Sequence, residues 1–244
     1  VVTRHDHPLL PGQMLIISWG RVPEEIHYPG ITILFEDGSL IVIEKEAGML
    51  SIATDKEIEK TAYSLLSQHV KKTDPKNKIF VVHRLDRETS GVMLFAKSQK
   101  IQSVLQEDWK KTIMERTYLA VVEGAFEKLE GSVTSYLRES KALIVYSSQD
   151  PDSGQQAVTH YKVLKQKNDY ALLEINLETG RKNQIRVHMQ DIGHSIVGDK
   201  KYGAKTSPLH RLGLHAKVLS FRHPISGKIV RFETEIPYKF LRLF

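Results

Sequence analysis

The chain has 244 residues, of which 41% are hydrophobic, so it can bury a full core in one large domain with or without an appendage. Its net charge of +6 arises from Lys and Arg residues spread along the chain, which favours a folded protein with a basic face for a polyanion, or merely a soluble basic protein. The chain has no Cys, which excludes disulfides, thiolate nucleophiles and cysteine-ligated metals.

The first 30 residues differ in character from the rest of the chain. Pro and Gly residues precede the apolar run Met14–Ile17, and Pro29-Gly30 closes the segment, which predicts a loop, a short strand and a linker. This segment is too short to fold alone. No charged and apolar leader is present, and no apolar run approaches the length of a membrane span, so we predict a cytoplasmic protein that does not engage a membrane.

From residue 31 onward the chain is rich in short β-type runs, several of which alternate apolar and polar residues as half-buried strands do. The predicted strands are 31–35, 40–43, 92–95, 117–122, 143–146, 158–164 and 170–177. Helical spacing appears in two further sets, Ile58, Ala62, Leu65, Leu66 and Val70, and Ile101, Val104 and Leu105. Because strands outnumber helices and do not alternate with them, we predict an α+β fold with a largely antiparallel, mixed central sheet flanked by helices and loops.

An aspartate between two arginines stands just before one predicted strand, in the run His83-Arg84-Leu85-Asp86-Arg87-Glu88-Thr89-Ser90-Gly91. An arginine within reach keeps an aspartate ionised and oriented, as a catalytic carboxylate requires to act as a nucleophile or base at neutral pH. Charged residues followed by Thr-Ser-Gly are also typical of an ordinary surface turn. This run alone therefore leaves both interpretations open.

A second candidate residue lies on the predicted strand within Glu115–Gly124. There Tyr118 can present its ring to a cavity while Leu119 and Val121 point the other way. A tyrosine on a strand is more often part of a core, so the position by itself does not decide between the two roles.

A third segment, Thr179–Met189, predicts a helix that follows Gly180 and that Gly193 ends. Arg186 projects away from the apolar stripe of this helix. Arg181 and Lys182 lie near the positive end of the helix dipole, which attracts phosphate, although such residues also form solvated basic faces.

These segments, in this order, closely resemble the RluA-type family of pseudouridine synthases, which act on structured RNA. The resemblance covers most of residues 31–243 and includes residues 34–37, 42–49, 193–203 and 214–216. It implies the pseudouridine synthase fold, with a catalytic domain over residues 31–244. The stretch Leu9–Ile17 resembles the last strand of an S4-type RNA-binding domain, so we expect residues 1–30 to be the C-terminal remnant of such a domain plus a linker.

The resemblance implies specific roles for site residues. Asp86 is expected to be the essential carboxylate, Tyr118 the active-site aromatic residue, and Arg186 the partner of Asp86. Arg84 corresponds to the arginine thought to help displace the target base. The expected substrate-binding residues are Arg84, His83, Arg181, Gln184 and His188.

The chemistry of uridine isomerisation agrees with these roles. The C1′–N1 bond breaks, the uracil turns, C1′ joins C5 and the C5 proton leaves, so the reaction is redox-neutral and we expect no cofactor and no metal. It requires a carboxylate that attacks C1′ or takes a proton from C2′, and these two alternatives stay open. It also requires an apolar platform for the detached uracil, which the Tyr118 ring can supply. The target must first leave its stack, as in other base-flipping enzymes.

The expected partner is RNA. We expect large-subunit ribosomal RNA, with transfer RNA as the alternative, because an S4-like remnant is more typical of the ribosomal branch of the family. We also expect a monomer.

Three positions depart from the usual family pattern: Asn183 replaces His, Arg116 replaces Lys and Glu46 replaces Pro. None of them is an expected catalytic position. An inactive binding module would be expected to lack Asp86 or Arg186, and both are present. A metalloenzyme is disfavoured because the 11 histidines include no HExxH or paired His-carboxylate spacing. A glycoside hydrolase would need a second acid to protonate its leaving oxygen.

Overall fold

The structure is a computed structural model that describes residues 26–53, 61–107 and 109–244. The predicted strand at Met14–Ile17 and the expected S4-like remnant lie outside the described residues, apart from residues 26–30. Strand β1 (Ile26–Tyr28) pairs antiparallel with β2 (Ile31–Glu36). The sheet therefore begins before residue 31, where the sequence places the start of the catalytic domain.

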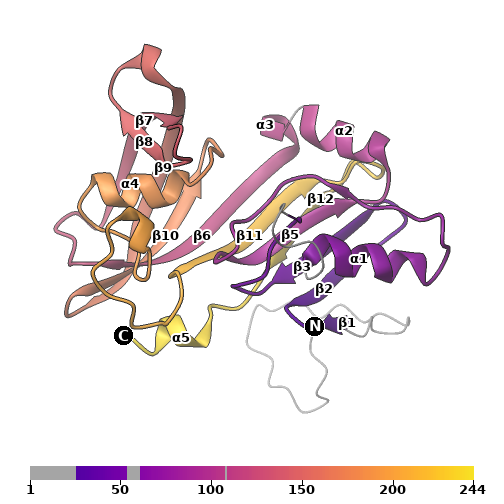
Figure 1. The fold of residues 1–244 in the computed structure, drawn as a ribbon, viewed down its shortest axis with the longest axis horizontal. Coiled ribbons are helices and arrows are strands. Elements are labelled where there is room, and N and C mark those ends of the chain that lie inside the picture. Colours follow the sequence, from indigo (N-terminus) through magenta and orange to yellow (C-terminus); the bar gives the residue numbers. More distant parts are fainter. Residues whose placement is uncertain (1–25, 54–60, 108) are drawn as a thin grey trace, which may run out of the picture.

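In the part of the chain that the structure describes, a single sheet of 12 strands contains both halves of the protein (Figure 1). Its further strands are β3 (Leu40–Lys45), β4 (Phe80–Val81), β5 (Ser90–Ala96), β6 (Ile113–Glu123), β7 (Glu130–Glu139), β8 (Val145–Ser148), β9 (Gln155–Lys167), β10 (Tyr170–Leu177), β11 (Leu214–Arg222) and β12 (Ile229–Glu233). The helices are α1 (Ala62–Lys71), α2 (Gln99–Glu107), α3 (Trp109–Thr112), α4 (Gln184–Asp191) and α5 (Tyr238–Leu241), with 3-10 turns at Pro151–Ser153 and Lys200–Tyr202.

The strand order is β1-β2-β3-β5-β11-β6-β10-β9-β7-β8, and every neighbouring pair is antiparallel except β5 and β11. Residues 26–107 form one half of the molecule, residues 113–202 form the other, and β11 returns between them (Figure 1). This arrangement confirms the predicted α+β class with a largely antiparallel, mixed sheet. None of the described helices is long and apolar enough to cross a membrane.

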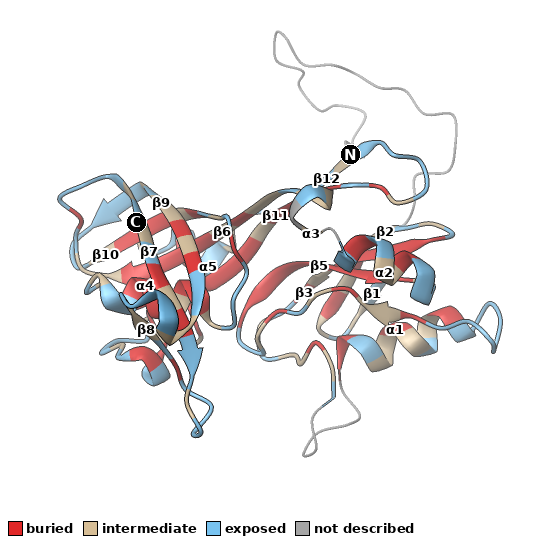
Figure 2. Ribbon diagram, turned by 90° about the horizontal axis from the view of Figure 1, so that it is seen from above, coloured by how far each residue is buried: buried red, intermediate tan, exposed pale blue. Residues whose placement is uncertain are grey.

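Side-chain alternation in β3 shows how the first half builds two cores on one sheet. Ile41 and Ile43 pack on the face that α1 covers, whereas Leu40 and Val42 pack on the face that α2 covers. Helix α1 starts at a capping box in which Thr61 and Ser64 exchange hydrogen bonds. In the other half, α4 packs Ile185 and Met189 against residues of β6 and β10. Figure 2 shows the buried residues concentrated along the strands.

Most predicted strands are confirmed, with shifted ends. The predicted strand 143–146 begins only at Val145, because Leu143 adopts the left-handed conformation with φ of 58° and forms a turn. The sequence analysis did not predict β7, β11 or β12. Strand β7 is rich in polar residues and exposes most of them, so its apolar signal is weak. Ile58, which was assigned to the first predicted helix, lies outside the described residues.

The parallel contact between β5 and β11 joins the two halves directly beside the Asp86 loop. Ser90 pairs with His215, and Gly91 pairs with Ala216. The Ser90 hydroxyl lies 2.8 Å from His215 Nδ1, and His215 Nε2 lies 2.8 Å from the Thr234 hydroxyl. Burial, with the positive charges of Arg211 and Lys217, lowers the pKa of His215 to about 4, so this buried link is neutral.

Only glycine fits at position 91. Its φ is 116°, and an added Cβ would lie 2.1 Å from the carbonyl oxygen of Ala216. We expect Gly91→Ala to lower the free energy of unfolding by about 3 kcal/mol or more, because backbone strain and the steric clash add together. Urea unfolding monitored by circular dichroism measures this change.

The matched control is Gly38→Ala, since nothing lies within 4 Å of a Cβ at that exposed position. We expect it to change stability by less than about 1 kcal/mol. Equal unfolding midpoints for the two variants would contradict the role assigned to the contact between β5 and β11.

Candidate active site

A cavity of about 530 Å³ lies between the two halves of the molecule. Its volume falls in the range typical of small-molecule sites. Residues from both halves line it: His83, Arg84, Leu85, Asp86, Thr89, Trp109, Arg116, Tyr118, Leu177, Gly180, Arg181, Lys182, Asn183, Gln184, Ile185, Arg186 and Leu214. The cavity therefore brings together all three segments that the sequence analysis singled out.

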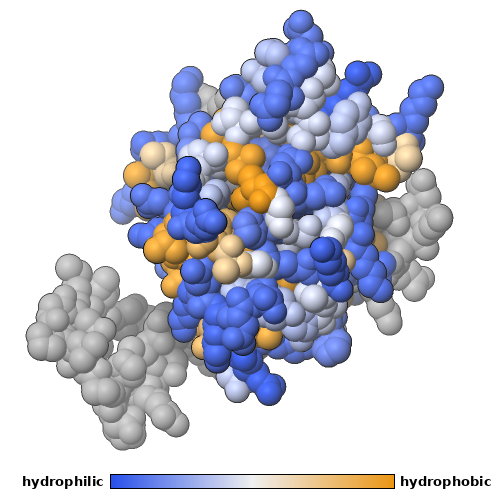
Figure 3. Space-filling model, turned by 90° about the vertical axis from the view of Figure 1, so that its left-hand side faces the viewer, coloured by the Kyte–Doolittle hydropathy of each residue, from blue (hydrophilic) through white to orange (hydrophobic). Residues whose placement is uncertain are grey.

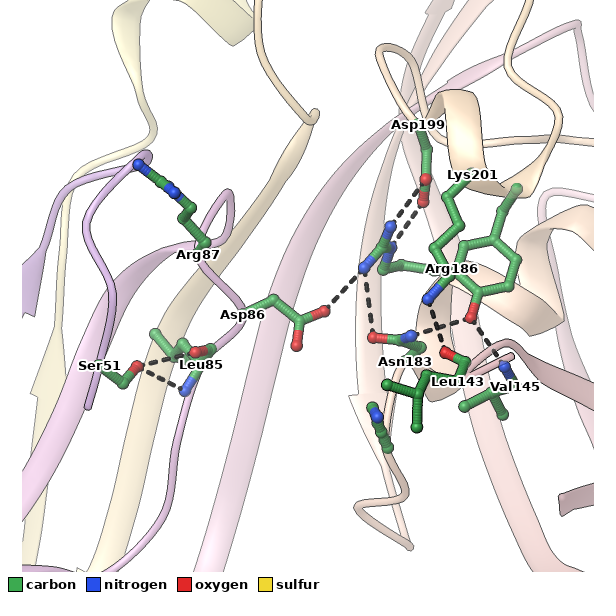
Figure 4. A network of polar contacts seen from close by, with 12 residues as sticks. Ser51, Leu85, Asp86, Arg87, Leu143, Val145, Asn183, Arg186, Asp199 and Lys201 are labelled. Carbon is green, nitrogen blue, oxygen red and sulfur yellow. Dashed lines mark hydrogen bonds and ion pairs between the residues drawn. The ribbon is translucent and has the colours of Figure 1, made fainter. Parts of the chain in front are cut away.

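An ion pair crosses this cavity. Arg186 Nη1 on α4 donates a hydrogen bond of 2.9 Å to Asp86 Oδ2, which lies in the loop before β5 (Figure 4). The Asp86 side chain is 34% exposed, so solvent and ligands reach it. Its Oδ1 accepts no hydrogen bond from any described residue. The pairing that the sequence analysis expected is thus present, and one carboxylate oxygen remains available.

Arg186 is held from its other side by Asp199, which is only 1% exposed. Arg186 Nε and Nη2 donate to the two oxygens of Asp199 at 2.7 and 2.8 Å, and the Tyr202 ring lies 4.8 Å from the guanidinium carbon. Burial opposes the charge of Arg186, but hydrogen bonds and charges from Asp199 and Asp86 outweigh it and raise its pKa. Arg186 is therefore a fixed cation.

Asn183, where the family usually has His, also supports Arg186. Its Oδ1 accepts from Arg186 Nη1 at 3.2 Å, and its Nδ2 donates to the Tyr202 hydroxyl at 2.8 Å (Figure 4). Asn183 adopts the left-handed conformation with φ of 55°, which Asn tolerates better than most residues. This position therefore orients the arginine.

The Asp86 loop is held on both sides by the last residue of β3 and by the loop that follows this strand. The Ser51 hydroxyl donates to the carbonyl of Leu85 at 2.7 Å and accepts from its N–H at 3.2 Å. Lys45 is fully buried, and its ammonium group donates to the carbonyl of Arg87 at 3.1 Å and to two carbonyls of its own loop. Gly48 N–H donates to the same Arg87 carbonyl at 2.9 Å. These bonds fix the backbone immediately before and after Asp86.

Tyr118 lies where the core clusters of the two halves meet, because its ring packs against both of them. It stands on β6 opposite Ala216 of β11 and Ile175 of β10. Burial and the charge of Asp86 raise the pKa of Tyr118, while Arg116 opposes this shift, so the phenol is neutral at neutral pH. The ring thus supplies an uncharged wall near Asp86.

Arg116, where Lys is common in the family, lies two residues before Tyr118 on the same face of β6. It donates to the carbonyl of Leu177 at 3.3 Å and passes over Gly180, where a Cβ would lie 2.4 Å from Nη1. Burial lowers its pKa, and the nearby Tyr118 opposes the shift. Arg116 therefore forms a positively charged part of the cavity wall.

His83 contributes to the wall without a charge. Its Nε2 accepts the N–H of Leu94 at 3.1 Å, and its ring lies 5.4 Å from the Trp109 ring. Burial and the charge of Arg116 lower the pKa of His83 to about 4. A neutral histidine that already accepts from the backbone can offer a substrate its Nδ1 and its ring face.

Exposed cations stand at the mouth of the cavity. Arg84 is exposed, and Arg181 and Lys182 precede α4. Arg181 Nε donates to the carbonyl of Gln156 at 3.2 Å, and Lys182 pairs with Glu139. Such side chains can exchange their partners for phosphate oxygens. Their placement agrees with the binding roles expected for Arg84 and Arg181.

Two of the expected substrate-binding residues act differently. His188 is fully buried on the opposite side of α4 from Arg186, between the hydroxyls of Ser135 and Thr159 at 2.9 and 2.8 Å, and does not line the cavity. The reason is helical geometry, since residues two apart point in nearly opposite directions. We therefore correct its role to that of a support for the helix.

Gln184 borders the cavity, but its side chain is only 2% exposed. Its amide oxygen accepts from Thr179 and from the Arg181 N–H, and its amide nitrogen donates to Val158 and Thr159. All of its hydrogen-bonding capacity is used within the protein. Gln184 therefore shapes the loop that carries Arg181 and does not bind substrate with its side chain.

The sequence analysis missed the residues that position the ion pair, namely Lys45, Ser51 and Asp199. Lys45 and Asp199 lay in segments quoted for the family resemblance, yet nothing local distinguished them from solvated charges. Among the residues that the structure describes, no three His, Asp or Glu side chains gather in a way that could hold a metal ion.

The comparisons with known proteins agree with this site. A family model described as RNA pseudouridylate synthase matches residues 39–191. The uncharacterized RNA pseudouridine synthase YhcT of Bacillus subtilis (strain 168) is 34% identical over 218 residues, which cover 88% of this chain and 71% of that protein. Ribosomal large subunit pseudouridine synthase D of Zymomonas mobilis is 35% identical over 232 residues, which cover 88% of this chain and 72% of that protein.

A solved structure shows the same fold. Human RNA Pseudouridylate Synthase Domain Containing 4 superposes with a TM-score of 0.70 at 24% identity, covering 86% of this chain and 90% of that one. Fold and site together define an RNA-modifying isomerase that converts uridine to pseudouridine. The chain belongs to the RNA pseudouridylate synthase family. The fold and the enzyme class predicted from the sequence are thereby confirmed.

The hydrogen bonds of Lys45 predict that activity is sensitive to alkaline pH. Burial and the charge of Arg211 lower the pKa of Lys45 to about 8, although Glu88 and Asp86 partly oppose the shift. Below this pH the ammonium group holds three carbonyls, and above it a neutral amine has only two N–H groups to donate. We therefore expect turnover at saturating RNA to fall as the pH rises through 8, approaching about tenfold per further unit.

The matched variant is Lys45→Met, which cannot titrate. It should be less active than wild type at pH 7, and its turnover should vary little between pH 7 and 9. A wild-type profile that stays flat up to pH 9, or the same alkaline decline in both proteins, would contradict a role for this lysine.

Arg186 should affect turnover more than RNA affinity, because it is committed to two carboxylates. We expect Arg186→Met to lower turnover by about 100-fold or more, since it leaves Asp199 buried and unpaired and Asp86 without its partner. Asp199→Asn should cause a smaller loss of about tenfold, because an amide keeps part of the contact. Single-turnover kinetics and filter binding separate the two effects.

Arg222→Met is the matched control, because Arg222 is exposed and, among the described residues, its side chain donates only to the carbonyl of Gly227. It should leave turnover unchanged. An Arg186→Met enzyme with normal turnover but weak RNA binding would show that this arginine serves the substrate and not Asp86.

Proposed function

We propose that Asp86 is the essential carboxylate of uridine isomerisation and that the RNA substrate is large-subunit ribosomal RNA. The observation that carries the first part is the geometry of Asp86. One of its oxygens is held by Arg186, whereas the other is turned away from the arginine and accepts no hydrogen bond from a described residue (Figure 4). A carboxylate that an arginine orients and that keeps one oxygen free suits a nucleophile or base.

The free oxygen of Asp86 has two chemical options at a bound uridine. It can attack C1′ as the C1′–N1 bond breaks, or it can take the proton from C2′. In the first case the new Asp86–C1′ bond breaks as C5 of the turned uracil joins C1′, and in the second case C2′ regains its proton from Asp86 as C5 joins C1′. In both cases the C5 proton then leaves and N1 gains a proton. Atoms and electrons balance without an external oxidant or reductant.

The cavity walls suit a uracil that has left its sugar. Tyr118 offers an aromatic ring, and Ile185 and Leu214 offer apolar side chains nearby. A base in such a surrounding can turn without losing strong directional contacts. Arg84 and Arg181 at the mouth are placed for the phosphates on either side of a flipped nucleotide, and Arg84 is proposed to help displace the base.

The ribosomal target is supported by relatives rather than by the site. Two proteins named ribosomal large subunit pseudouridine synthase D, from Zymomonas mobilis and Nitrosomonas europaea, are each 35% identical to this chain. Recognition of structured RNA depends on shape and loops that no single residue encodes. Transfer RNA is the alternative substrate. The cytoplasmic location and the monomeric state stay predictions.

Mapping of pseudouridines in RNA from cells with and without this protein tests the target. We expect one or a few large-subunit ribosomal positions to lose their modification in its absence. Loss confined to transfer RNA would overturn the ribosomal assignment and leave the chemistry intact.

Asp86→Asn tests the essential carboxylate. The amide keeps the shape but removes the charge, so RNA binding should persist while product formation falls below about 1% of wild type, because loss of a nucleophile or base raises the barrier by several kcal/mol. Release of pseudouridine after nuclease digestion measures the product. Glu88→Gln is the control, since it makes the same change on an exposed residue of the same loop.

The control enzyme should stay active. Turnover of Asp86→Asn above a few per cent of wild type would remove Asp86 from the central role.

A further inference from the structure

A second hollow of about 430 Å³ adjoins the active-site cavity, and Trp109, Arg116 and Leu177 form part of the wall of both. We propose that this hollow binds the base of a nucleotide next to the target uridine. The inference rests on the proposed function, because it requires a uridine in the first cavity. It adds a site of sequence recognition that the isomerisation itself does not need.

The apolar part of the hollow suits a flat ring. Trp109 is half-buried, and Met114 on β6 is 52% exposed although it is a large apolar side chain. When a target base flips out, its neighbour loses a stacking partner, and an aromatic ring with a thioether beside it can replace that partner.

The lining of the hollow includes two acidic residues, Glu115 and Glu178, and one cation, Arg116, so its charges favour a base over a phosphate. The carboxylates of Glu115 and Glu178 pair with Arg231 at 3.0 Å and with His160 at 2.6 Å. A phosphate placed here would meet two carboxylates. A base would instead bring amino and imino N–H groups that carboxylates can accept, while its ring lies against Trp109.

Gln156 gives the hollow a means to read the base. It is exposed on β9, and its side-chain amide makes no hydrogen bond with any described residue. An amide presents a donor and an acceptor side by side, which matches the edge of a base. Its backbone carbonyl accepts from Arg181 at the mouth of the first cavity, so a hydrogen bond links the two sites.

The experiment is a double-mutant cycle between protein and RNA. The probe is a synthetic RNA hairpin that spans the uridine identified by mapping, together with versions in which the nucleotide on either side is abasic. For wild type, we expect one of the two abasic positions to lower kcat/KM by about tenfold. For Trp109→Ala, the same abasic change should cost less than about twofold, because the contact is already lost.

Three further variants complete the design. Trp109→Phe keeps a ring and should keep the sensitivity to the abasic change, which excludes a folding defect as the cause. Gln156→Ala should reduce discrimination among the four bases at the sensitive position. Gln155→Ala is its matched control, since Gln155 is also exposed but points to the opposite face of β9.

The outcomes are distinct. Indifference of wild type to both abasic positions, or equal tenfold losses in wild type and Trp109→Ala, would overturn the neighbouring-base site while the proposed function stands. Failure of wild type to form pseudouridine in any RNA would instead overturn the proposed function, and this inference with it.

Discussion

The structure depends on one ion pair that joins residues 100 positions apart in the chain. Asp86 comes from the first half of the molecule and Arg186 from the second, so the pair exists only when the whole sheet has formed. The two carboxylates that meet Arg186 are not equivalent. Asp199 is buried and takes two of its N–H groups, whereas Asp86 is partly exposed and takes one. The pair with Asp199 therefore anchors Arg186, and the pair with Asp86 presents a carboxylate to a ligand.

The backbone geometry where β5 and β11 join the two halves sets the distance between Asp86 and Arg186. The Asp86 loop leads directly into β5, which meets β11 at Gly91, and β11 in turn pairs with β6, which carries Tyr118. A shift of β5 along β11 would move the carboxylate and the ring relative to each other. Lys45 and Ser51 then fix the loop itself, so the site is positioned by bonds to the main chain as much as by contacts between side chains. Figure 4 shows the two bonds between Ser51 and Leu85.

The parts that the sequence predicts are those encoded locally. Strands such as Tyr170–Leu177 follow from a short apolar run, and Asp86, Tyr118 and Arg186 follow from motifs in a recognisable order. Contacts between distant segments leave no such signal. His188 and Arg186 are both polar residues on one helix, and only the strands packed beneath α4 decide which of them is buried. The sequence around Lys45 likewise indicates a solvated lysine. Only the folded structure buries it and places three carbonyls around its ammonium group.

The positively charged side chains around the cavity differ in how deeply they are buried. Arg186 is engaged by two carboxylates, while Arg84 and Lys182 at the mouth are exposed, and Lys182 pairs with the surface residue Glu139. Apolar and hydrophilic side chains are interspersed on the end of the molecule formed by the second half, without one dominant apolar area (Figure 3). An approaching RNA would therefore meet the exposed cations at the mouth first. Only a base that has left its stack would reach the ion pair of Asp86 and Arg186 in the cavity. We therefore propose that affinity and chemistry depend on different arginines, because exposed charges bind phosphate in exchange for water and ions whereas buried charges orient one carboxylate.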